Sequence, residues 1–306
     1  MKKIRKIYLA GCGDSLFAAL GSRLFFQQVT GIDVEPVDSM EFSRYIAPHM
    51  PPDTVVFGIS NSGRVSRTVE ALLQARRYGA PTVAMTGYAD RNAAAGADAI
   101  LVGALPNIRS MLDSVSARVE SSQQDHLFSD MSRPGVMERL PAAMGLPPGI
   151  DLLLFMLGAY LSSLAHLFTA ALQIGLARGH ITDTQAEKHR ETLMKAVEII
   201  VRSTYNTLDP VQQLAERFRD KDAFLFLGAG PSYASASLSA AKLFEQPHLN
   251  GVAQYLEEWA HLQFFFTRPD GVPVFVIVPP GDSRDRAVEQ IDGLSLIHIS
   301  EPTRPY

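Results

Sequence analysis

Short apolar runs alternate with helical periods along the first third of the chain. The pattern predicts five strands, over residues 7–10, 34–37, 55–59, 81–86 and 99–102. Helical periods follow the first three of these runs, and strands that alternate with helices are typical of a doubly wound parallel sheet. The first part of the chain is therefore predicted to be an α/β domain.

The pattern changes after residue 102. Residues 103–149 contain several prolines and no sustained period, apart from a helical stretch over residues 110–120, and the sequence assigns this segment no role. Helices are then predicted over residues 151–177, 184–205 and 209–218. We expect these helices to join two parts of the fold.

The opening pattern returns in the second half of the chain. Residues 224–232 repeat residues 7–15 as an apolar strand, Gly-x-Gly, one residue, and a serine that opens a helix. The run over residues 274–278 echoes the strand at 55–59, but Pro-Pro-Gly-Asp follows it in place of serines. We therefore expect two related α/β halves, of which the second is incomplete.

The repeat sets the expected domain bounds. Residues 1–183 would form the first domain with its long loop and connecting helix, and residues 184–292 the shorter second domain. Residues 293–306 follow no strand or helix pattern. We interpret them as a non-native tail on a chain that is truncated at its C-terminal end.

The net charge and the cysteine count argue against nucleic-acid binding and against disulfide-bonded proteins. The chain has 306 residues, 46% hydrophobic, with a net charge of −4, which gives no electrostatic footprint for nucleic acid. Cys12 is the only cysteine, so a disulfide within the chain is impossible and a reducing cytoplasm is the expected location.

One stretch is long and apolar enough to span a bilayer. Residues 150–177 carry only Asp151 as a formal charge. Five polar side chains interrupt it, and aromatic belts are missing, so we favour a core or dimer-interface helix over a membrane helix. The polar residues are Ser162, Ser163, His166, Thr169 and Gln173.

Small hydroxyl residues follow the strand at 55–59. Ser60, Asn61, Ser62 and Gly63 precede a helical period that starts near Thr68. The backbone N–H groups of a helix N-terminus, together with serine hydroxyls, suit an oxyanion such as phosphate. An ordinary helix N-cap is the alternative interpretation.

Three ionisable residues of the second half suit proton transfer. Lys242 and Glu245 lie three residues apart and thus on one helix face, where a carboxylate beside an ammonium can carry a proton. His261 follows sixteen residues later, and imidazole titrates near neutral pH. A solvated ion pair and a structural histidine are the alternatives.

These motifs resemble the tandem sugar-isomerase (SIS) fold, and most closely the isomerase domain of glutamine–fructose-6-phosphate aminotransferase. Residues 12–15, Cys-Gly-Asp-Ser, stand where that family has Cys-Gly-Thr-Ser. Residues 60–65, Ser-Asn-Ser-Gly-Arg-Val, stand where it has Ser-Gln-Ser-Gly-Glu-Thr. The resemblance covers roughly residues 3–102 and 221–291, and it implies two flavodoxin-like halves.

The resemblance also implies a sugar-phosphate site in the first half. The binding residues by position would be Cys12, Gly13, Ser15, Ser60, Asn61, Ser62 and Arg64. Two of the chain's residues depart from the family pattern, because Val65 replaces a hydroxyl residue and Asp14 adds a negative charge. Arg64 can offset that charge.

The catalytic residues implied by the resemblance lie in the second half. Residues 242–245 match the family's Lys-x-x-Glu and residues 258–261 its Glu-x-x-His. Glu245 would carry a proton between C1 and C2 of the sugar, Lys242 would stabilise the developing charge, and His261 would open the ring, oriented by Glu258. Neither a metal nor a cofactor is expected. The site would lie at the subunit contact of a homodimer.

The sequence leaves other functions open. The chain has no glutaminase domain before Met1, so we expect a phosphosugar isomerase-type enzyme without that activity. A fructosamine-6-phosphate deglycase and a non-catalytic sugar-phosphate-binding regulator are the alternatives. A dinucleotide dehydrogenase with Asp38 on the ribose is disfavoured, because Leu16 stands where the third glycine of its motif belongs.

Overall fold

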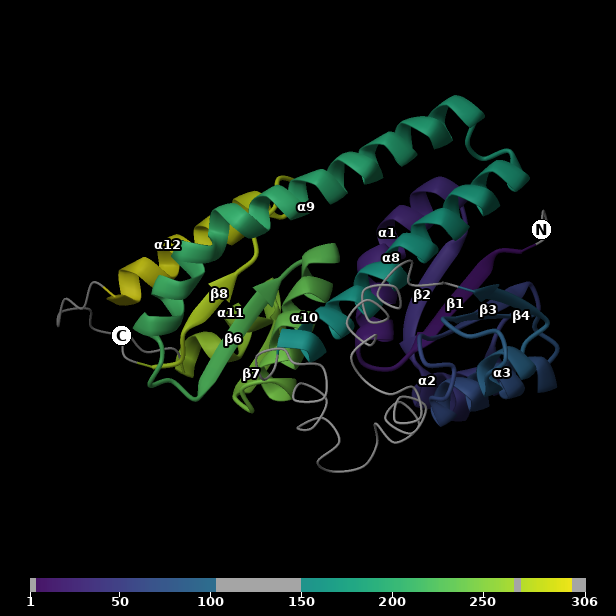
Figure 1. The fold of residues 1–306 in the computed structure, drawn as a ribbon, viewed down its shortest axis with the longest axis horizontal. Helices are drawn as coiled ribbons and strands as arrows, with labels where there is room; N and C mark the ends of the chain where they lie inside the picture. Colours follow the sequence, from purple (N-terminus) through teal and green to yellow (C-terminus); the bar gives the residue numbers. More distant parts are fainter. Residues whose placement is uncertain (1–3, 103–149, 267–270, 299–306) are drawn as a thin grey trace, which may run out of the picture. The chain divides into compact units, whose positions relative to one another are not determined.

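The chain folds into two α/β units, each built on its own parallel sheet (Figure 1). This computed structural model describes residues 4–102, 150–266 and 271–298. The N-terminal unit comprises residues 3–23 and 32–169. The C-terminal unit comprises residues 1–2, 24–31 and 170–306.

Five strands form the sheet of the N-terminal unit. They are β1 (Lys6–Gly11), β2 (Asp33–Asp38), β3 (Thr54–Ser60), β4 (Thr82–Thr86) and β5 (Ala99–Val102). All neighbouring pairs are parallel, in the order β2-β1-β3-β4-β5. The doubly wound sheet expected from the five apolar runs is confirmed.

The switch point of this sheet lies between β1 and β3. The chain first moves from β1 to β2 on one side and then to β3 on the other, so the loops after β1 and β3 leave the same edge in opposite directions. Open parallel sheets bind their ligands in the crevice at such a point. The two serine-containing loops follow these two strands.

Helices and turns of this unit follow the strands in sequence. They are α1 (Asp14–Thr30), α2 (Ser39–Glu41), the π-helical turn η1 (Phe42–Ile46), the 3-10 turn η2 (Ala47–His49), α3 (Ser66–Arg77) and α4 (Asn92–Ala95). Apolar residues of β1, β3 and α3 bury each other in the core, among them Tyr8, Val56 and Ala71. The carboxylate of Asp38 caps α2.

The C-terminal unit repeats the first three strands of the other sheet. It contains β6 (Ala223–Gly228), β7 (Asn250–Tyr255) and β8 (Val274–Val276), in the parallel order β7-β6-β8. This order corresponds to β2-β1-β3, which confirms the expected repeat of two α/β sheets. β7 is a strand that the apolar pattern had not revealed.

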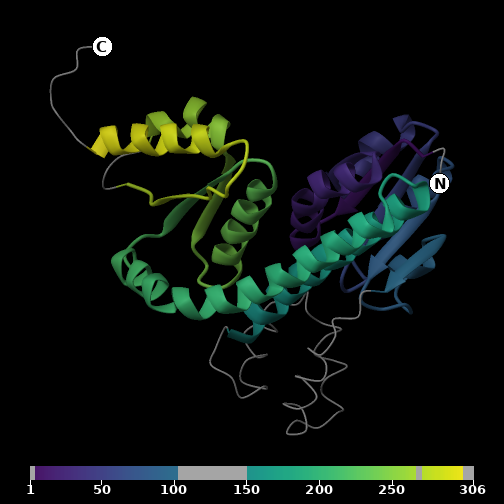
Figure 2. The same ribbon diagram turned by 90° about the horizontal axis from the view of Figure 1, so that it is seen from above.

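Side chains alternate between the two faces of this second sheet. Leu225 and Leu227 pack with Trp259 of α11 (Leu256–His261) and with α12 (Arg284–His298). Phe226 points to the other face and stacks on Phe275. Helix α10 (Pro231–Glu245) packs on β6 and β7, and η3 (Gln263–Phe266) follows α11 (Figure 2).

Two long helices connect the sheets in sequence. α8 (Ile150–Arg178) contains Gly158–Arg178, which by length and composition alone could cross a membrane; 33% of its apolar window is buried inside the structure. α9 (Asp183–Arg217) is one helix, although two were expected. It continues through Pro210, which lacks the backbone N–H for one hydrogen bond of the helix.

The ends of α1 and α8 pack on each other in the C-terminal unit. Arg178 Nε donates to the carbonyl oxygen of Thr30 at 3.0 Å. A Cβ at Gly175 would lie 2.3 Å from the carbonyl oxygen of Val29, so only glycine allows this approach. Residues 24–31 and the end of α8 both belong to the C-terminal unit, whereas sequence analysis had assigned them to a first domain over residues 1–183.

The last described helix enters the segment that had no predicted structure. α12 runs to His298, beyond the expected start of the tail at residue 293. Residues 299–306 lie outside the described part of the chain, as do residues 103–149 with the helix predicted at 110–120.

Candidate functional site

The loop after β1 holds the first group of predicted binding residues. A Cβ on Gly11 would lie 2.9 Å from the backbone nitrogen of Leu16, so glycine allows α1 to start directly against the strand. Gly13 has a φ of 54°, in the left-handed region that favours glycine. Cys12 and Ser15 are half-buried in this turn.

A tyrosine that sequence analysis missed lies close to this loop. Tyr160 of α8 is buried, and burial raises the pKa of its hydroxyl to about 12, with the Asp14 carboxylate raising it further. The negative charge that Asp14 adds to the family pattern therefore acts on a neutral phenol at physiological pH. No sequence motif links residues so far apart.

The loop after β3 holds the second group. Ser60 is 1% exposed, and its hydroxyl has no hydrogen-bond partner among the described residues. Asn61 is half-buried and Ser62 is exposed. Arg64 is exposed as well, and its backbone N–H donates to Ser62 Oγ at 3.3 Å. This loop leads into the N-terminus of α3, where anions are favoured.

The sheet brings these two groups to one edge. β1 and β3 are neighbours, with Ala10 opposite Gly58, so the loops that follow them emerge side by side at the switch point. All seven predicted binding residues, from Cys12 to Arg64, belong to these two loops. Whether they contact a sugar phosphate stays a prediction.

The predicted proton-transfer pair is formed in the C-terminal unit. Lys242 Nζ donates to Glu245 Oε2 at 2.6 Å on the last turn of α10. The lysine side chain is 10% exposed and the glutamate side chain 30%. The pair is thus more buried than a solvated surface ion pair, which was the alternative from sequence.

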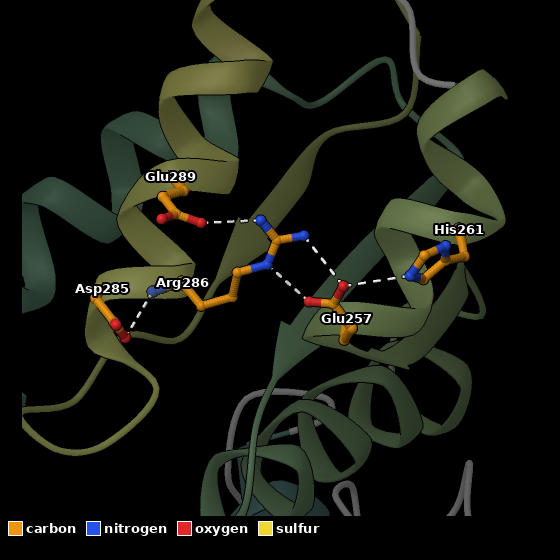
Figure 3. Close-up of polar contacts among 5 residues, drawn as sticks. All are labelled: Glu257, His261, Asp285, Arg286 and Glu289. Atoms are coloured by element: carbon orange, nitrogen blue, oxygen red, sulfur yellow. Dashed lines mark hydrogen bonds and ion pairs between the residues drawn. The ribbon is translucent and has the colours of Figure 1, made fainter.

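His261 contacts a different carboxylate from the expected one. Its Nε2 lies 3.3 Å from Glu257 Oε1, whereas sequence analysis had assigned Glu258 to this role (Figure 3). Glutamates at three and four residues before a histidine can both reach it on a helix, so the sequence could not choose between them. Trp259 of the same helix is 1% exposed and packs against the sheet.

An arginine of α12 holds Glu257 in place. Arg286 donates to both oxygens of Glu257, at 2.7 and 3.1 Å, and to Glu289 at 2.9 Å (Figure 3). The hydrogen bonds from Arg286 hold the pKa of the Glu257 carboxyl below its ordinary value. Glu257 therefore stays ionised opposite His261 at neutral pH.

Glu245 and His261 stand at opposite ends of β7. The lysine–glutamate pair on α10 precedes the first residue of this strand, and His261 ends the helix that follows the last. Six residues of strand span about 20 Å. β7 therefore separates the two groups along the chain.

No group of three or more His, Cys, Asp and Glu side chains suited to a metal is found within residues 4–102, 150–266 and 271–298. The Asp38 carboxylate, which a dinucleotide site would use, instead accepts hydrogen bonds from Met40 N at 2.7 Å and Glu41 N at 3.2 Å.

A known protein family matches the N-terminal part of the chain. Residues 1–120 match the family model of the SIS domain. Curated relatives include the glutamine–fructose-6-phosphate aminotransferases (isomerizing) of Thermotoga maritima, 26% identical over 282 residues, and Methanothermobacter thermautotrophicus, 25% over 291. They cover 91% and 95% of this chain, which spans only 38% and 40% of their own lengths.

Solved structures agree on the fold. The C-terminal domain of glucosamine-fructose-6-phosphate aminotransferase from Francisella tularensis superposes with a TM-score of 0.73 at 17% identity, over 96% of this chain and 71% of that one. A putative phosphosugar isomerase from Salmonella typhimurium gives 0.67 at 19%, over 95% and 76%. The resemblance expected from the motifs is confirmed.

Proposed function

This chain carries a SIS domain and is a distant relative of the isomerase domain of glutamine–fructose-6-phosphate aminotransferase, and from this premise we propose that it acts on phosphorylated sugars. The reaction that we infer is proton transfer between C1 and C2 of a ketose or aldose 6-phosphate or an amino-sugar phosphate. The observation that carries the proposal is the buried hydroxyl of Ser60, unpaired among the described residues at the switch point. The expected compartment is the cytoplasm.

Phosphate binding is the task of the two loops of the N-terminal unit. The hydroxyls of Ser15, Ser60 and Ser62 would donate to phosphate oxygens, and the N-termini of α1 and α3 would add backbone N–H groups and favourable dipoles. Binding energy from the phosphate, remote from the reacting carbons, would then orient the sugar.

Proton transfer is the task of the C-terminal unit. Glu245 would take the proton from C1 of the open-chain ketose and return it to C2, while Lys242 stabilises the negative charge of the enediolate between the two steps. His261 would open the sugar ring. The 2.6 Å contact between Lys242 and Glu245 supports their action as one unit.

A second copy of the chain would complete the site. Glu245 ends the helix before β7 and His261 ends the helix after it, and a strand of about 20 Å between them supports their coming from different copies. We therefore propose a homodimer in which one copy supplies Glu245 and the other supplies His261.

Proton exchange tests the reaction directly. The 306-residue chain is incubated with fructose 6-phosphate in D₂O and followed by NMR. We expect deuterium to enter C1 or C2. Saturable binding without exchange would favour the non-catalytic regulator, and release of an amine from fructosamine 6-phosphate without exchange on fructose 6-phosphate would favour the deglycase. The proposal fails if no phosphorylated sugar binds.

Glu257 is the carboxylate that we expect to position His261. Glu257→Gln should slow the exchange roughly tenfold through a misplaced imidazole. The dissociation constant for fructose 6-phosphate should not change, because Glu257 acts through His261 and does not contact the phosphate. Exchange rates by NMR and affinity by calorimetry separate the two effects.

Two further variants complete this comparison. Glu289→Gln removes the other acceptor of Arg286 but leaves Glu257 against His261, and should exchange at the wild-type rate. Glu258→Gln tests the residue suggested by the sequence. If Glu258→Gln lowers the exchange rate more than Glu257→Gln does, Glu258 and not Glu257 orients His261.

A further inference from the structure

The segment between β4 and α4 lies over the turn that follows β3. Ser60 and Thr86 are opposite each other in the sheet, at the carboxyl ends of the two strands. The backbone N–H of Gly87 donates to the Asn61 carbonyl at 2.9 Å, and that of Ala93 to the Gly63 carbonyl at 3.0 Å. Residues 87–93 therefore form a wall of the site proposed for the phosphate.

Arg91 is the cationic residue of this wall. A Cβ added to Gly63 would lie 2.5 Å from Arg91 Cβ and 2.8 Å from Thr86 Oγ1, so the arginine packs directly on the glycine of the turn. The N–H of Gly63 in turn donates to the Ser60 carbonyl at 2.9 Å. Ser60 and Arg91 thus flank the same glycine.

Both flanking residues have a buried polar atom without a hydrogen-bond partner in the described part of the chain. These atoms are Ser60 Oγ and Arg91 Nε. Buried polar groups are nearly always paired, so two unpaired donors at one turn call for an acceptor from outside the chain. The third such atom in this unit, Thr54 Oγ1, lies at the opposite end of β3.

The guanidinium of Arg91 lies near an aromatic ring and a carboxylate, but that carboxylate is too far away to accept a hydrogen bond from it. Its guanidinium carbon lies 5.0 Å from the centre of the Tyr88 ring. Arg91 forms an ion pair with Asp90, whose side chain is 82% exposed and whose Oδ1 lies 3.8 Å from Nε, beyond hydrogen-bond distance. The guanidinium keeps donors for a further oxyanion.

We propose that Arg91 is a specificity-determining residue of this loop, where its guanidinium and the Ser60 hydroxyl donate to the same phosphate group of a sugar phosphate. Guanidinium matches phosphate in both charge and geometry. Arg64, the cation suggested by the sequence, is exposed, and its backbone N–H donates to Ser62 Oγ. The ligand class rests on the proposed function, whereas the role of Arg91 in oxyanion binding can be tested separately.

The test compares four proteins by isothermal titration calorimetry. Fructose 6-phosphate and inorganic phosphate are titrated into the wild-type chain, Arg91→Gln, Ser60→Ala and Arg77→Gln. We expect Arg91→Gln and Ser60→Ala to raise the dissociation constants of both ligands by about tenfold to a hundredfold, because each variant loses one charge-assisted or buried hydrogen bond to the phosphate. Arg77→Gln is the matched control, because it removes an arginine beside a tyrosine ring at the far end of α3.

The outcomes separate the two proposals. Equal affinities of wild type and Arg91→Gln overturn the role of Arg91 and leave the proposed function standing. If wild type binds inorganic phosphate but no sugar phosphate, the sugar assignment fails, and loss of phosphate binding in Arg91→Gln still supports Arg91. Absence of binding for both ligands overturns both proposals.

Unfolding without phosphate excludes a purely structural role. Since Arg91 Nε is buried and unpaired among the described residues, Arg91→Gln should leave the midpoint of urea unfolding unchanged or raise it. A lower midpoint would mean that Arg91 holds the loop through Tyr88, and would overturn the proposal.

Discussion

Replacement of Glu245 by glutamine is expected to stop proton exchange and to leave fructose 6-phosphate binding intact. The amide keeps the shape of the side chain but cannot accept the proton from C1, so the exchange rate should fall roughly 100- to 10,000-fold. The proposed phosphate-binding residues lie on other loops, so calorimetry should give the wild-type dissociation constant. A rate within threefold or so of wild type would remove Glu245 as the proton carrier.

A second ion pair of the same geometry provides the control. Glu187 accepts from Arg190 at 2.7 Å, three residues away on α9, as Glu245 does from Lys242 on α10. Glu187→Gln therefore loses a comparable helix ion pair without touching the proposed chemistry. It should exchange at the wild-type rate.

Mixing two inactive variants tests whether the site is shared between copies. Glu245→Gln and His261→Asn should each be inactive in exchange. If each site takes Glu245 from one copy and His261 from the other, random reassociation should restore about a quarter of the wild-type sites. No recovery in dimers shown to have exchanged subunits would contradict the shared site.

Alanine at Gly228 is expected to give the largest loss of stability. β6 ends at this glycine, and a Cβ there would lie 2.3 Å from the Ser232 carbonyl oxygen and 2.7 Å from the backbone nitrogen of Tyr233. Both atoms belong to the first turn of α10, which cannot move without leaving the sheet. We expect the free energy of unfolding to fall by about 3 kcal/mol.

Fluorescence of Trp259 follows this unfolding in the intact chain. It is the only tryptophan, it is 1% exposed, and it packs with Leu225 and Leu227 of β6 in the core of the C-terminal unit. A urea titration followed at this residue therefore reports the unit that contains Gly228.

The neighbouring glycine of the same turn is the matched comparison. Gly230 has a φ of 53°, but a Cβ there would meet no atom within 4 Å. Gly230→Ala should lower the free energy of unfolding by about 2 kcal/mol, the strain of an alanine held at φ 53° and ψ −130°, a backbone region that is almost confined to glycine. A smaller loss for Gly228→Ala than for Gly230→Ala would contradict the steric argument.

The two Gly-x-Gly turns could be predicted from the sequence. Gly11 and Gly228 each admit the first turn of the following helix, and Gly13 and Gly230 each adopt a positive φ. The shared spacing of these glycines predicted two related strand–turn–helix units. It could do so because the close approach of the helix and the positive φ both arise within a few neighbouring residues. β7 was missed because only half of its positions are apolar and its partner strand is distant in sequence.

Contacts between distant segments could not be predicted in this way. Arg91 packs on Gly63 because β4 lies beside β3, and Arg286 binds Glu257 because α12 returns to the same face of the second sheet. Neither pair has a characteristic spacing in the chain. The choice of Glu257 over Glu258 opposite His261 likewise depends on side-chain geometry that two adjacent glutamates do not reveal.

Local sequence patterns were enough to predict the parallel sheets, the repeated glycine turns and the residue types of the two candidate sites. Apolar periods, glycine requirements and i, i+3 pairs are local properties that act over a few residues. Which loops share the switch point, and that Ser60 and Arg91 flank one glycine, became known only from the folded chain. These relations follow from strand order and helix packing, which bring together segments that no local pattern connects.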